Sequence, residues 1–229
     1  MLPMRLISMV LKINWAKNKS STYTTMKNIF FSLITLGLCV TMMAEAQEFD
    51  KSLASAKTAY NSGNLEDARF NLENALREVD AAIGREILKV LPTTMDGMKT
   101  DTKNDQVTGM AAGFAAGLYV QRTYGQTSEK HASINIISDS PLMAGINAIL
   151  AMPSIMNTGD SNQKVVKVHG YKSLLNRQTD ENNQTTGYQL QVPFSNSMLT
   201  LEYSGTITEA AMLNLANTIP MDQIVKIAQ

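Results

Sequence analysis

The sequence predicts an α+β protein: an N-terminal antiparallel helical hairpin, followed by an antiparallel sheet of about five strands backed by two helices. Between residues 49 and 90, apolar residues recur every three or four positions, which is the period of a helix. From Leu118 onward the period falls to two, which is the period of a strand with one buried face. Helices that precede a run of strands are typical of α+β folds. We therefore expect three parts: a segment at 1–46, a hairpin at 47–92 and an α+β domain at 93–229.

The N-terminal segment has the pattern of a signal peptide. Lys27 precedes an apolar run at 29–40, and Ala44-Glu45-Ala46 then offers a small-x-small cleavage site. The apolar run is about 12 residues long, whereas a membrane-spanning helix needs about 20. We therefore expect cleavage after Ala46 and export to the periplasm or the extracellular space.

Two alternatives remain open within this segment. The true start is either Met1 or Met26, and Met26 is favoured because Met26-Lys27 opens a signal peptide of ordinary length. The second alternative is lipidation at Cys39. A lipoprotein signal has a small residue before its cysteine, but Leu38 stands there, so cleavage after Ala46 is favoured.

The charge of the exported form argues against nucleic-acid binding. Without residues 1–46 the chain keeps 15 Lys and Arg against 19 Asp and Glu, a net charge near −4. Such a chain lacks the basic surface that nucleic acids attract. Cys39, the only cysteine, is removed as well, so we expect neither a disulfide nor thiol chemistry. The remaining residues, about 183, can supply a core without disulfides.

The helical hairpin is predicted from two apolar stripes and a break between them. The first stripe runs from Phe49 to Tyr60, and the break is Asn61-Ser62-Gly63-Asn64, in which Asn64 can cap a second helix. The second stripe ends before Pro92 and comprises Leu65, Ala68, Leu72, Leu76, Val79, Ile83, Ile87 and Val90. We expect this stripe, including Leu72 and Leu76, to be buried.

Part of the hairpin resembles a tetratricopeptide repeat. The matching positions are Ala59-Tyr60, Gly63, Ala68, Phe70 and Ala75-Leu76, within residues 49–80. The family's tryptophan and terminal proline are not matched. The resemblance implies a helix-turn-helix architecture, and peptide binding only if several copies stack, because one copy cannot form the concave surface of such arrays.

Two segments separate the hairpin from the first strand. Residues 93–108 are polar and predict a linker or surface loop. Gly109, Gly113 and Gly117 then recur at a spacing of four. This pattern is typical of helices in close contact in a membrane or an oligomer. It also fits a glycine-rich segment that directly precedes a strand. The apolar stretch at 110–120 is too short to cross a bilayer, which favours the second interpretation.

The remaining chain predicts strands and two helices. Strands are expected at 118–124, 133–138, 165–171, 188–192 and 199–203, with a polar loop at 176–186. Asp139-Ser140-Pro141 should start one helix, and Thr208 should cap the last one. This order of elements across 93–229 resembles the Mog1/PsbP-like domains of exported proteins. The resemblance rests on element order alone and implies a fold, not a site.

The sequence contains no motif that identifies a catalytic, cofactor or metal site. His131 and His169 stand alone, without the spacing of metal ligands. Arg122, between Tyr119 and Tyr124, is the candidate binding cluster, because an arginine can stack on aromatic rings or hold a carboxylate. Its other interpretation is a surface arginine that covers apolar residues.

We therefore expect a non-enzymatic exported protein that binds an envelope protein or a small ligand, as an accessory or assembly factor, with no cofactor and no metal. One alternative is an exported enzyme whose site is assembled from scattered residues. The other is a membrane-surface or lipid-binding protein that uses residues 109–120.

Overall fold

The computed structural model describes residues 47–108, 117–125, 130–140, 142–152 and 162–229. The chain divides into two compact units, residues 1–51 and 52–229. Of the first unit, residues 47–51 are described and are helical. The signal peptide, the two alternative starts and Cys39 lie outside the described residues, as does most of the glycine-rich segment. The description below concerns the second unit.

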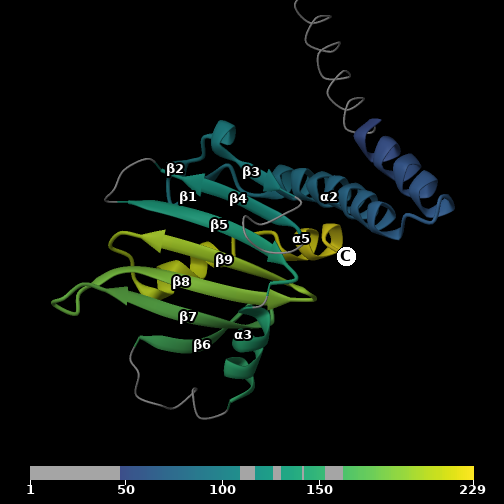
Figure 1. The fold of residues 1–229 in the computed structure, drawn as a ribbon. Coiled ribbons are helices and arrows are strands. Elements are labelled where there is room, and N and C mark those ends of the chain that lie inside the picture. Colours follow the sequence, from purple (N-terminus) through teal and green to yellow (C-terminus); the bar gives the residue numbers. More distant parts are fainter. Residues whose placement is uncertain (1–46, 109–116, 126–129, 141, 153–161) are drawn as a thin grey trace, which may run out of the picture. The chain divides into compact units, whose positions relative to one another are not determined.

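The unit begins with a helical hairpin, as the sequence predicts. Residues 52–61 are helical, and α2 (Leu65–Val90) follows after a turn that reverses the chain (Figure 1). Gly63 makes this turn possible, because its φ of 80° is a conformation that side chains disfavour. The Asn64 side chain accepts a hydrogen bond from the backbone N–H of Asp67 at 3.2 Å and caps α2.

The main sheet has seven strands, which corrects the expected five. Their order is β3-β4-β5-β9-β8-β7-β6, and every neighbouring pair is antiparallel. Figure 1 shows this order from the β3 edge to the β6 edge. The strands are β3 (Gln106–Thr108), β4 (Tyr119–Tyr124), β5 (His131–Ser138), β6 (Gln163–Val168), β7 (Tyr171–Thr179), β8 (Thr185–Phe194) and β9 (Ser197–Ser204).

The predicted linker at 93–108 is structured. It forms the small hairpin β1 (Thr94–Met95) and β2 (Met98–Lys99), the short helix η1 (Thr102–Asn104) and then β3. Asp96 and Gly97 make the tight turn of the hairpin with φ values of 47° and 74°. These strands have two or three residues each, too few for an alternating pattern to be recognised in the sequence.

The predicted polar loop at 176–186 is also largely strand. β7 continues to Thr179 and β8 starts at Thr185, so the loop itself is short. Its polar residues belong to strands because one face of the sheet is polar here. Asn176 pairs with Gln189 across these two strands, and the Asn176 side-chain amide lies 3.4 Å from the Gln189 side-chain oxygen.

Helices cover both faces of the sheet, whereas the sequence suggested two backing helices. On one face, α2, α4 (Glu209–Ala216) and α5 (Met221–Ile227) share a core with the strands, centred on Ile87, Ile134, Leu190, Leu201 and Met212. On the other face, α3 (Leu142–Ala151) packs through Ile146 on Leu174 and Met198. Thr208 caps α4, as predicted, by accepting a hydrogen bond from the Ala211 N–H.

Candidate functional site

Arg122, the predicted binding residue, is part of an internal cross-link. It lies on the buried face of β4 and is 4% exposed. Its Nε donates to Asp105 Oδ1 at 3.0 Å and its Nη2 to Asp105 Oδ2 at 2.5 Å, while Nη1 donates to the Leu91 carbonyl at 2.9 Å. The bidentate bond to Asp105 raises the pKa of Arg122. The carboxylate that Arg122 holds therefore belongs to the protein, and Arg122 ties the end of α2 to the sheet.

The two tyrosines of the predicted cluster lie on opposite faces of β4. Tyr124 shares the buried face with Arg122, and its hydroxyl donates to the Pro92 carbonyl at 2.8 Å. Burial raises the pKa of Tyr124 far above its ordinary value. Tyr119 is partly exposed on the other face, where burial and then the charge of Glu202 raise its pKa. The structure thus brings Arg122 and Tyr124 together and leaves Tyr119 apart.

The two histidines are separated in the sheet. His131 is the first residue of β5, and His169 lies in the turn after β6 with a φ of 49°. Three strands lie between β5 and β6 in the order of the sheet. Across the described parts of the chain, no three His, Cys, Asp or Glu side chains gather where they could hold a metal ion.

The predicted burial of the second stripe is wrong for its large residues as far as Val79, although Ala68 is buried. Leu72 is 48% exposed and Leu76 is 60% exposed. Among the described residues, nine large apolar side chains are exposed, and seven of them lie in the hairpin: Leu53, Tyr60, Leu65, Phe70, Leu72, Leu76 and Val79. We call Leu65, Leu72, Leu76 and Val79 the hairpin stripe. A monomeric protein rarely leaves such a concentration of apolar side chains in water without a function for it.

The exposure of the hairpin stripe has a structural reason. The buried residues of the first helix and of α2 up to Val79 are small, namely Ala56, Ala68 and Ala75, so the buried contacts of this part do not need the leucines. Only the second half of α2 lies on the sheet, where Ile87 is fully buried in the main core. Periodicity in the sequence located the stripe correctly but could not show that nothing within the described residues covers its first half.

Acidic residues accompany the hairpin stripe along one side. Glu66, Glu73 and Asp80 recur every seven residues, and each directly follows a residue of the stripe. Glu73 accepts a hydrogen bond from Arg69 at 2.9 Å. The pKa of Asp80 is raised, first by burial and then by the charge of Asp139, so ionising Asp80 destabilises the folded protein. We call these three residues the acidic flank.

Comparisons with known proteins give no relative. No family model matches the chain, and neither a curated protein nor a solved structure matches it. The resemblances to a tetratricopeptide repeat and to Mog1/PsbP-like domains therefore stay predictions. Among the helices of the described part, none has the length and apolar character needed to cross a membrane. The glycine-rich residues 109–116, on which a membrane role would depend, lie outside the described residues.

Proposed function

We propose that this chain is exported to the cell envelope and acts there as a non-enzymatic binding protein, whose partner protein docks on the hairpin stripe. The observation that supports this is the gathering of seven of nine exposed large apolar side chains in the hairpin. Burying apolar surface is the main driving force of protein association, at about 25 cal/mol per Å². A partner that covers the stripe would remove from water the largest apolar group of side chains that the described unit exposes.

The partner that best fits the stripe is an amphipathic helix with basic residues beside its apolar face. Leu65, Leu72 and Val79 are seven residues apart, and Leu76 stands between two of them, which is the spacing of a helix-helix contact. Glu66 and Asp80 of the acidic flank would lie beside such a helix and would be matched by Lys or Arg, whereas Glu73 is already bonded to Arg69. A basic side chain near Asp80 would also compensate the repulsion that Asp80 experiences from Asp139.

The acidic flank also separates this partner from two others. A second copy of the chain in antiparallel contact would place the acidic flank against itself, which like charges oppose. A membrane surface rich in anionic lipids would be repelled by the same residues. Both therefore fit the charges of the hairpin less well than a basic helix does.

Site-specific photo-crosslinking in envelope extracts tests the proposal. The reactive group is placed at Leu76 and, as a control, at Phe70, which is also exposed and apolar but lies about 120° away around α2. We expect Leu76 to capture one protein, with the crosslink in a basic amphipathic helix, and Phe70 to capture little. Binding of a synthetic copy of that helix should then weaken at least about tenfold in Leu76→Glu and change less than about twofold in Phe70→Glu.

Three results would contradict the proposal: equal capture from both positions, capture only of a second copy of the chain, or binding of vesicles in place of the helix. Both variants should keep the circular dichroism spectrum and melting temperature of the parent, because both positions are exposed. A loss of binding can therefore be assigned to the surface and not to unfolding.

A further inference from the structure

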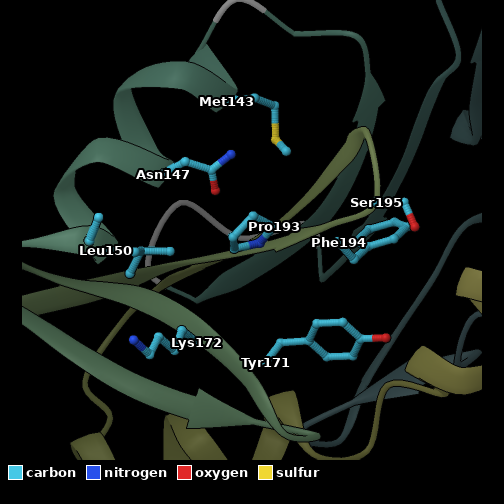
Figure 2. A pocket seen from close by; sticks show the side chains of 9 residues that line it. Met143, Asn147, Leu150, Tyr171, Lys172, Pro193, Phe194 and Ser195 are labelled. Atoms are coloured by element: carbon cyan, nitrogen blue, oxygen red, sulfur yellow. The ribbon is translucent and has the colours of Figure 1, made fainter.

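A pocket lies on the face of the sheet that carries α3, away from the hairpin. Its cavity volume is about 450 Å³, within the range of small-molecule sites. Figure 2 shows Met143, Asn147 and Leu150 reaching from α3 toward Pro193 and Phe194 at the end of β8, with Tyr171 and Lys172 of β7 on the opposite side. Most of this lining is apolar, and its polar groups are few and separate. An apolar cavity with a few polar groups is the usual form of a ligand site.

Lys172, at one end of the pocket, faces Lys167 of the neighbouring strand, and neither forms an ion pair within the described part of the chain. Lys172 of β7 and Lys167 of β6 are direct partners in the sheet register, and both are exposed. Lys172 lies two residues before Leu174, which packs under α3, so Lys172 is on the same face as α3. Like charges directly opposite each other destabilise a pair of strands. The register of the sheet therefore holds two positive charges together at an energetic cost.

Within the described residues, the elements around these lysines supply no neutralising acid. The described residues 142–152 and 162–179, which form α3, β6 and β7, contain no Asp or Glu. Glu209 of α4 pairs with Lys164 at 2.6 Å on the other face of the sheet. Asp139 is bonded by the Asn196 amide at 3.0 Å, next to Ser195, and Figure 2 places Ser195 and Lys172 at opposite ends of the pocket. The Lys172 end thus carries local positive charge on a chain whose exported form is acidic overall.

We propose that this pocket binds a single-chain amphiphile with a carboxylate head group. The apolar chain lies in the cavity between Leu150, Met143 and Phe194, where it removes apolar surface from water. The carboxylate lies at the end with Lys172, where the ammonium group can donate to its oxygens. Its charge also relieves the repulsion between Lys167 and Lys172.

Isothermal titration of the purified protein with three probes tests this site: decanoate, decanol and acetate. Decanoate carries both the chain and the head group, decanol lacks the charge, and acetate lacks the chain. We expect saturable decanoate binding, weaker decanol binding and no detectable acetate binding. Lys172→Gln should weaken decanoate about tenfold and leave decanol unchanged, because a hydrogen bond to a charged group is lost.

Two further variants complete the test. Lys164→Gln is the matched control, because Lys164 is on the same edge strand but faces the other side, and it should bind decanoate like the parent. Ala151→Trp places a large side chain in the pocket and should weaken both decanoate and decanol. The proposal is wrong if decanoate does not bind, if Lys172→Gln and Lys164→Gln have equal effects, or if Ala151→Trp leaves binding intact.

Discussion

Arg122 shows how a charged residue can sit in the core of this protein without a ligand. Its guanidinium group is buried, but each of its three nitrogens donates to an oxygen of Asp105 or Leu91. Removing charges from water is costly, and only a well-formed set of hydrogen bonds offsets that cost. The arginine and the aspartate therefore depend on each other, and neither can be removed alone without loss.

We expect Asp105→Ala to lower the free energy of unfolding by about 3 kcal/mol, because it leaves a buried guanidinium without its anion. Urea denaturation at neutral pH measures this change. The double variant Arg122→Met, Asp105→Leu should cost less than Asp105→Ala, since it removes both charges and fills the space. A larger loss in the double variant would show that the ion pair stabilises the fold by its own attraction.

Asp80 gives a pH-dependent prediction. Burial and Asp139 raise its pKa in the folded protein above the ordinary value of 3.8. Because the pKa of Asp80 is higher in the folded protein, the stability that its protonated carboxyl contributes is fully present below pH 3.8. This stability is lost as the pH rises through the folded-state pKa. At pH 7 the ionised carboxylate therefore destabilises the fold.

We accordingly expect Asp80→Asn to raise the melting temperature at pH 7 by about 1–3 °C. The difference from the parent should disappear below about pH 3.8, where Asp80 is protonated in both states. Thermal melts across this range provide the measurement, with Glu181→Gln in the exposed loop as a control. A constant difference at all pH values would mean that charge is not the cause.

At the scale of elements, the long helices and five strands of the main sheet could be read from the sequence. β7 (Tyr171–Thr179) was missed, because its polar residues 176–179 resemble a loop. α2 runs from Leu65 to Val90 as its period, its Asn64 cap and Pro92 indicate. β1, β2 and β3 could not be predicted, because two or three residues carry no period and their stability comes from neighbouring strands. For the hairpin stripe, the helical period locates the apolar face of α2. Whether that face is buried depends on how far the sheet extends along the helix, which the period does not show.

One close approach between a helix and the sheet occurs at Gly84 of α2. A Cβ atom there would lie 2.5 Å from Val107 Cγ1 of β3, which is closer than real contacts allow. Gly84 therefore lets the helix approach the sheet, although glycine weakens a helix interior by about 1 kcal/mol.

We expect Gly84→Ala to destabilise the protein by about 1–2 kcal/mol, since the clash outweighs the gain in helix propensity. Gly145→Ala in α3 is the matched control, because nothing lies within 4 Å of its Cβ position. That variant should stabilise the protein by about 0.5–1 kcal/mol. Chemical denaturation of both variants makes the comparison, and a stabilising Gly84→Ala would show that β3 moves aside easily.

At the scale of the whole molecule, the proposed export depends on the first 46 residues. We expect the exported protein to begin at Gln47, because Ala44-Glu45-Ala46 follows the apolar run. N-terminal sequencing and intact mass of the protein from the envelope fraction check this. A lipidated N-terminus at Cys39, or an uncut protein in the cytoplasm, would contradict it.

The order of the strands has a consequence for how the chain folds. β4 and β5, and likewise β6, β7, β8 and β9, are joined by short connections, and ten residues separate β3 from β4, so each group can assemble from contacts close in sequence. The two groups meet only where β5 pairs with β9, through residues that are 59 to 73 positions apart, from Ser138↔Ser197 to His131↔Ser204. Closing a chain segment of this length before its contacts form is the slow part of folding. We therefore expect the folding rate of this protein to be set at that one junction, and changes in the length of the segment between β5 and β6 to alter the rate more than the stability.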